Sequence, residues 1–162
     1  MKRKLCLVLL LLLPLLVMGP SASADKPTME RFPVDDVFVD ESCGFPVEVH
    51  IVGTVVHIEW TDEAGHVRFL EAYPGYRLIL TNLDTGETIT ATISGPAHFT
   101  AEPDGSFTLI GTGIWGWFFN PATGEQGLFL TKGRFVTAVD AEGNESFSIV
   151  GEIVNLCPEL AA

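Results

Sequence analysis

The sequence predicts an all-β fold in which neighbouring strands run antiparallel. From Cys43 to Cys157, short runs of β-branched and aromatic residues alternate with turns rich in Gly, Pro, Asn and Asp, which is the pattern of strands and hairpins. No stretch of this region shows the 3.6-residue period of an amphipathic helix. The turns are too short for the crossovers that parallel strands require. Strands are expected near residues 46–60, 66–73, 76–83, 87–94, 97–103, 106–119, 126–131, 133–139 and 145–156.

Two of these segments are longer than a typical strand. Fully extended, residues 45–60 would span about 50 Å. We therefore expect Gly53 to bend this segment at a sheet corner or bulge, and residues 106–119 carry Gly111, Gly113 and Gly116 in the same role. Long bent strands in a meander favour a small closed β-barrel of about eight or nine strands over a two-sheet sandwich.

The N-terminus predicts export. The basic start MKRK is followed by an apolar run from Leu5 to Val17 and then by the small-residue site Ala22-Ser23-Ala24, which together are typical of a signal peptide. The apolar run spans about 20 Å as a helix, so it is too short for a bilayer core of roughly 30 Å. We expect residues 1–24 to be cleaved after Ala24 and the product to be secreted, without a membrane span.

The exported product divides into three parts. Residues 25–42 mix acidic residues with two prolines and scattered apolar residues, so we expect an acidic, loosely ordered leader. Residues 43–157 have the length and pattern of a single barrel-like β domain. Residues 158–162 remain as a C-terminal tail.

Loss of the signal peptide removes Cys6 and leaves two cysteines, Cys43 and Cys157. A pair at the two ends of one domain predicts a disulfide in an oxidising compartment. Such a bond closes a loop of roughly 100 residues and contributes about 4–5 kcal/mol. A metal site or a redox pair would need closer spacing or further ligands.

The chain is strongly acidic. It has 9 Lys and Arg against 21 Asp and Glu, a formal net charge of −12, and the product is more negative still once Lys2, Arg3 and Lys4 leave with the signal. Binding to nucleic acid or to an anionic membrane needs clustered cations, so both classes of function are excluded. With 47% hydrophobic residues, the chain is not a disordered acidic tail either.

Two pairs of polar residues are candidates for acid–base chemistry. Glu48 and His50 share one strand face, as do His57 and Glu59, because side chains two positions apart point the same way. Positions 50 and 57 differ in parity, so the pairs face opposite sides unless a bulge at Gly53 brings them together. Solvated or ion-paired surface residues are the other interpretation. No metal-ligand motif occurs, and we expect no metal and no cofactor.

The most distinctive run is GTGIWGWFF at residues 111–119. On an extended strand, Trp115, Trp117 and Phe119 share one face. They are candidates to line a cavity or to form a stacking platform for an apolar or sugar ligand. The alternative is that these large rings, opposite glycines, simply fill the interior of a small barrel.

Five motifs follow one another along the domain. They are CGFPV at 43–47, TNLDTGE at 81–87, GTGIWGWFF at 111–119, GLFLTKGRF at 127–135 and GEIVNLC at 151–157. In order and spacing they resemble those of a family of small exported proteins of unknown function in high-GC Gram-positive bacteria. The resemblance implies an exported bacterial β domain with paired terminal cysteines, and it implies no activity, ligand or catalytic residue.

These observations favour a non-catalytic binding protein. We expect its ligand to be a small apolar molecule, or its partner to be a component of the cell envelope or the extracellular space. The alternative is a small β-barrel enzyme of the isomerase, cyclase or hydrolase type, with a cavity near the Trp115–Trp117 strand. The two hypotheses differ in whether titratable groups converge in a cavity with Trp115.

Overall fold

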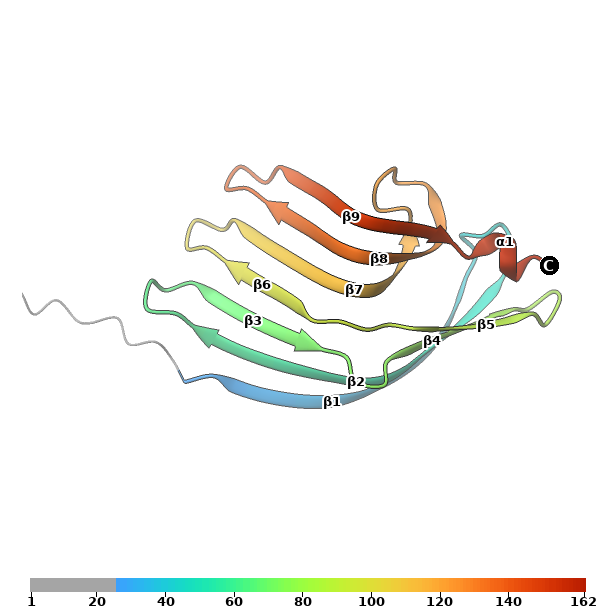
Figure 1. Ribbon diagram of the computed structural model, residues 1–162, viewed down its shortest axis with the longest axis horizontal. Helices are drawn as coiled ribbons and strands as arrows, with labels where there is room; N and C mark the ends of the chain where they lie inside the picture. The colour runs from blue at the N-terminus through green and yellow to red at the C-terminus, as the bar shows by residue number, and fades with distance from the viewer. Residues whose placement is uncertain (1–25) are drawn as a thin grey trace, which may run out of the picture.

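The computed structural model describes residues 26–162, and this part of the chain forms nine strands and one short helix (Figure 1). All nine strands belong to a single sheet with antiparallel neighbours, so the predicted all-β fold is confirmed. The predicted signal peptide, residues 1–24, lies outside the described residues. The elements are β1 (Thr28–Asp40), β2 (Val47–Thr61), β3 (Val67–Ala72), β4 (Arg77–Asn82), β5 (Thr88–Thr92), β6 (Ala97–Ala101), β7 (Phe107–Phe119), β8 (Gln126–Val139), β9 (Glu145–Asn155) and α1 (Cys157–Leu160).

The sheet departs from the predicted meander at β2, which pairs with both β3 and β4. β2 pairs with β4 through residues 47–52 and with β3 through residues 56–61, so β3 and β4 follow one another along the same side of β2. β5 and β6 repeat this arrangement beside β4 and β3. β7, β8 and β9 then follow in order, while β1 lies on the far side of β2 (Figure 1).

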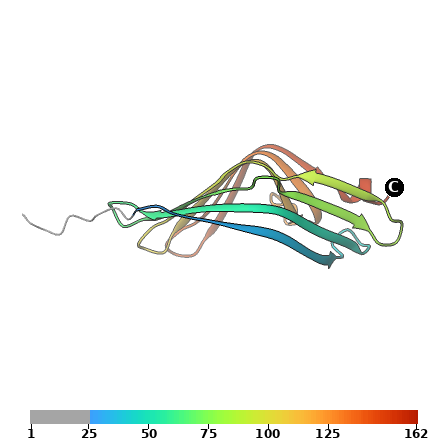
Figure 2. The same ribbon diagram turned by 90° about the horizontal axis from the view of Figure 1, so that it is seen from below.

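The sheet is open, and the predicted closed barrel is not supported. Within residues 26–162, β1 and β9 form no ladder with each other. A closed barrel needs strands that curl with a constant stagger. Here the strands β7, β8 and β9 bend sharply near their middles instead (Figure 2). One end of the sheet therefore folds into two layers around a core, while the other end stays a single layer.

A line of glycines crosses the sheet where these strands bend. Gly113 on β7 pairs with Gly133 on β8, which pairs with Gly151 on β9. Gly133 and Gly151 have φ of +147° and +149°, which L side chains rarely adopt. A Cβ on Gly133 would collide with the carbonyl oxygen of Val150, and a Cβ on Gly151 with that of Lys132. We call Gly113, Gly133 and Gly151 the glycine crease.

The crease is also the point at which the two layers separate. Gly95, between β5 and β6, lies so close to β7 that a Cβ would collide with the carbonyl oxygen of Thr112. Beside it, the backbones of Ser94 and Ile114 exchange two hydrogen bonds, of 3.0 and 2.7 Å. Apart from this bridge, β5 and β7 form no ladder with each other, so β2, β4 and β5 form one layer, and β7 and β8 with α1 form the other.

The hydrophobic core fills the space between these layers. Val47, Val49 and Leu80 from the first layer meet Leu128 and Leu160 from the second, and all five are essentially inaccessible to solvent. Burial of one such side chain contributes about 1.5–3 kcal/mol. The two-layered end therefore carries most of the apolar burial, and the cysteines Cys43 and Cys157 also pack against its core.

The predicted loose leader forms strand β1 instead. Thr28–Asp40 pairs residue by residue with β2, with no register shift. The backbone supplies these hydrogen bonds, so the strand needs no buried apolar face, and almost all its side chains are exposed. An edge strand can carry the charges of Glu30, Asp35 and Asp36 because they remain in water.

The predicted C-terminal tail begins within helix α1. Leu160 is fully buried, and its carbonyl oxygen accepts a 2.9 Å hydrogen bond from Nδ2 of the buried Asn82. Cys157, at the start of the helix, forms the predicted disulfide with Cys43, and the two Cα atoms lie 5.3 Å apart. The bond joins the chain just before β2 to α1, so it ties the two layers together and not the first strand to the last.

Replacing both Cys43 and Cys157 by Ser should lower the free energy of unfolding by about 4–5 kcal/mol. The reason is that a crosslink across 114 residues restricts the unfolded chain. Urea unfolding followed by tryptophan fluorescence measures the difference. A loss below about 1 kcal/mol would show that the two layers hold together without the bond.

Gly151→Ala should destabilise the fold more than Gly143→Ala. Gly143 also has a positive φ, +85°, but an added Cβ there has nothing within 4 Å, so this control carries only the backbone strain of about 1–2 kcal/mol. At Gly151 the collision with β8 adds about 1–3 kcal/mol. Equal losses for the two variants in urea unfolding would contradict a role for close packing at the crease.

Candidate functional site

A cavity of about 250 Å³ lies between the two layers, next to the glycine crease. Its walls are mainly apolar and come from both layers, which is the usual character of a small-molecule site. Its volume is below the roughly 300–1,000 Å³ typical of pockets for drug-sized ligands, so it suits a smaller molecule. It is lined by Ile51, Tyr73, Tyr76, Leu78, Ile93, Trp115, Gly116 and Phe118.

Trp115 is the one predicted aromatic residue that lines this cavity. Its ring meets those of Tyr73 and Phe135 nearly at right angles, with centroids 5.1 and 5.3 Å away. Its Nε1 donates a 3.0 Å hydrogen bond to the carbonyl oxygen of Thr112. These contacts hold the indole in place. Trp117 and Phe119 line a separate cleft instead, because alternation along β7 places them on the face opposite Ile114 and Phe118, which pack against the core.

A hydrogen-bonded row of polar side chains continues from Tyr73. The Tyr73 hydroxyl donates to Oε2 of Glu71, and Nδ1 of His57 lies 3.0 Å from Oε1 of the same carboxylate. Nε2 of His57 lies 3.3 Å from Glu59. Burial, and then the hydrogen bond to Glu71, raises the pKa of Tyr73, so its hydroxyl stays neutral. Burial lowers the pKa of His57, but Glu71 and Glu59 outweigh it and the net shift is upward.

Tyr76 is the second tyrosine that lines the cavity. Burial, followed by the nearby charges of Asp36 and Glu71, raises the pKa of Tyr76. Its hydroxyl therefore stays neutral and can donate a hydrogen bond. Such a group can fix the orientation of a ligand that carries a single polar atom.

The four predicted polar residues do not converge. Because β1 and β2 pair without a register shift, alternation places Glu48 and His50 on one face of β2 and His57 and Glu59 on the other. His50 lies 2.7 Å from a carboxylate oxygen of Asp35 on β1. Only His57 is linked, through Glu71, to a residue that lines the cavity.

Sequence reasoning missed Glu71, Tyr73 and Tyr76. A partial signal was present, because positions 71 and 73 share a face of one strand. The missing information was that His57 pairs with Glu71 across β2 and β3. This register depends on where the hairpin turns, and a shift by one residue would place Glu71 on the opposite face.

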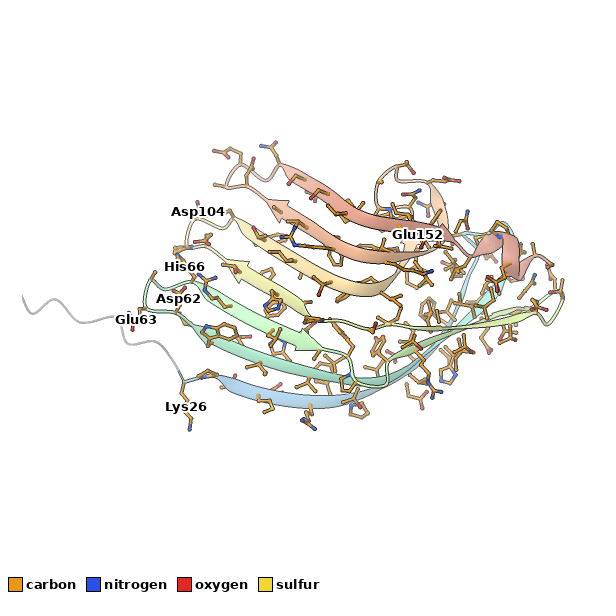
Figure 3. The ribbon with its side chains drawn as sticks, viewed as in Figure 1. Lys26, Asp62, Glu63, His66, Asp104 and Glu152 are labelled. Carbon is orange, nitrogen blue, oxygen red and sulfur yellow. A yellow bond between two sulfur atoms is a disulfide. The ribbon has the colours of Figure 1, made fainter. Side chains whose placement is uncertain are left out.

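A second charged cluster joins two hairpin tips at one end of the sheet, where Figure 3 labels Asp62 and His66. His66 lies 3.0 Å from Asp62 and 2.9 Å from Glu102. Arg68 Nε donates to Asp62 at 2.7 Å, and this bond is the largest cause of the lowered pKa of that carboxyl group. The cluster ties the β2–β3 hairpin to the β6–β7 hairpin. Among residues 26–162, no group of His, Cys, Asp and Glu is arranged to hold a metal ion.

No protein-family model, curated protein or solved structure matches this chain. In the part of the chain that the structure describes, no helix combines the length and the apolar character needed to cross a bilayer. Function is therefore inferred from the site itself.

His57 should make stability depend on pH. Its pKa is raised above the ordinary 6.5, so its ion pairs stabilise the fold fully below about pH 6, and this contribution is lost as the pH rises through the raised pKa. His57→Gln should therefore reduce the drop in stability between about pH 6 and pH 9. Urea unfolding at both pH values measures this. An unchanged drop would contradict the role of the Glu71 and Glu59 pairs.

Proposed function

We propose that this chain is a non-catalytic binding protein that holds a small apolar ligand in the cavity between its two layers. The cavity beside Trp115 is the observation that carries the proposal. Its volume is about 250 Å³, and Ile51, Leu78, Ile93 and Phe118 supply apolar walls. Burial of an apolar molecule against such walls contributes about 25 cal/mol per Å² removed from water.

The side chains that line the cavity are held in fixed positions, which favours tight binding of a small ligand. Leu78 and Ile93 are part of the hydrophobic core, and Trp115 is fixed by two aromatic contacts and a hydrogen bond. Little side-chain freedom is lost on binding when the walls are already ordered. The neutral hydroxyl of Tyr76 offers one polar contact, while the negative charges of Asp36 and Glu71 near it disfavour an anionic ligand.

The disulfide supports a function outside the cytoplasm. Structural disulfides persist in oxidising compartments, and the bond between Cys43 and Cys157 links both layers. Together with the predicted signal peptide and the resemblance to exported bacterial proteins, it favours a ligand or partner from the envelope or the extracellular space. The acidic surface then limits non-specific association with other anionic surfaces.

A catalytic function is the second candidate, and the row His57–Glu71–Tyr73 is what favours it. A carboxylate between an imidazole and a phenol is a common arrangement for proton transfer. However, both carboxylate oxygens of Glu71 are already engaged by His57 and Tyr73, and Glu71 is not among the residues that line the cavity. The row therefore holds the Tyr73 side chain in position and has no free group that reaches a bound molecule. A binding function is the better supported of the two.

The neutral fluorescent probe N-phenyl-1-naphthylamine should bind the oxidised protein saturably and with one-to-one stoichiometry. Ile51→Trp should weaken this binding about tenfold or more, because the larger side chain fills the cavity and removes more than about 1.4 kcal/mol of binding free energy. Fluorescence titration measures both affinities.

Val52→Trp is the matched control for Ile51→Trp. Val52 is the next residue on β2, and its side chain lies on the opposite face of the strand. Its substitution should leave probe binding unchanged. The proposal fails if the unaltered protein shows no saturable binding, or if the two tryptophan variants weaken it equally.

A further inference from the structure

The bent part of the sheet also encloses a second hollow, a cleft of about 380 Å³ between the two arms of β7, β8 and β9. Trp117, Phe119 and Pro121 line it from one arm, and Thr137, Glu145 and Phe147 line it from the other. In the ladder, Trp117 pairs with Phe129 while Phe147 pairs with Thr137, far apart along β8. The sharp bend at the glycine crease brings the Trp117 and Phe147 ring centroids to within 5.8 Å.

Three aromatic rings form adjoining walls of this cleft. The plane of Trp117 makes angles of 68° with Phe119 and 83° with Phe147, so the rings enclose a corner and do not form one flat layer. Phe135, which is 2% exposed, packs under Trp117 at 5.1 Å, and Nε1 of Trp117 donates a 3.0 Å bond to Thr131. The walls are therefore held in place before any ligand arrives, while Phe119 remains 42% exposed at the opening.

The charge around the cleft determines the ligand that it suits. Glu145 is the one ionisable residue among those that line it, and no Lys or Arg takes part. The faces of aromatic rings attract cations through their quadrupole, most strongly for Trp. A carboxylate beside perpendicular rings adds a full negative charge, and the formal net charge of −12 steers cations toward the protein.

We propose that this cleft binds an alkylated ammonium group, with the trimethylammonium head as its best fit. The methyl groups of such a cation contact the three rings, and its charge is balanced by Glu145. A primary ammonium is more strongly hydrated and fits less well, and anions are repelled. The site is separate from the cavity at Trp115 and does not depend on the apolar ligand proposed there.

Choline should bind the oxidised protein saturably, as measured by calorimetry and by NMR shifts of the Trp117 indole. Its neutral isostere 3,3-dimethyl-1-butanol, which replaces the nitrogen by carbon, should bind at least about tenfold more weakly, the loss expected when a desolvated cation–π contact is removed. Equal binding of the two compounds, or no binding of choline, would overturn the proposal.

Two pairs of variants distinguish the contacts made inside the cleft from the general effect of losing a charge or an aromatic ring elsewhere on the protein. Glu145→Gln should weaken choline binding about tenfold, whereas Glu63→Gln, the same change of charge at a hairpin tip (Figure 3), should not. Phe119→Leu keeps an apolar side chain but removes a ring and should also weaken binding, while Phe38→Leu, at a similarly exposed position of 40%, should not. Equal effects within either pair would overturn the assignment of the site.

The cation could belong to a free solute or to a lipid headgroup. Sedimentation with phosphatidylcholine vesicles distinguishes these sources. If the protein co-sediments with the vesicles and the Glu145→Gln variant does not, the ligand is the lipid headgroup. If the protein binds free choline but does not co-sediment, the ligand is a free solute. Ile51→Trp, which fills the other cavity, should leave choline binding unchanged. A loss of choline binding in Ile51→Trp would overturn the separation of the two sites.

Discussion

The close approach of backbones at the glycine crease is the constraint on which the rest of the structure depends. At Gly133 and Gly151, neighbouring strands lie so near that any side chain would collide with a carbonyl oxygen. This packing allows β7, β8 and β9 to bend sharply instead of curling gradually. Because the bend is concentrated at one line, the part of each strand on the α1 side of it can lie over β2, β4 and β5, and the core between them becomes possible.

The same bend shapes the cavity at Trp115 and the cleft at Trp117. Between the layers, the core fills the space except next to Trp115, where a cavity remains. On the concave side of the bend, the two arms of β7–β9 face each other and bring Trp117 close to Phe147. Two tryptophans separated by one residue thus line different hollows, one between the two layers and the other next to Glu145.

Most of the strands and their antiparallel pairing could be predicted, because hairpin turns and β-branched runs are local signals. The pairing of β2 with both β3 and β4 could not. Likewise, residues 126–131 and 133–139 were expected as two strands and form the single strand β8, since a glycine inside a strand looks like a turn. Strand β1 was missed for a related reason. Both of its faces are exposed, so its sequence does not show the alternation of polar and apolar residues by which a half-buried strand is recognised. Of the candidate site, only the aromatic residues of β7 could be predicted. Glu71 and Tyr73 could not, because their places in the site depend on which residues of β2 and β3 lie opposite one another.

The sequence by itself determined the fold class, the pairing of the two cysteines and the separation of His50 from His57, because these depend on composition, count and the two-residue period of a strand. Tertiary structure alone decided that the sheet stays open, that Trp115 and Trp117 line different hollows, and that His57 meets Glu71. The physical reason is that curvature and register arise from contacts between strands distant in the chain. A glycine permits a bend, and only its neighbours across the sheet determine whether that bend is made.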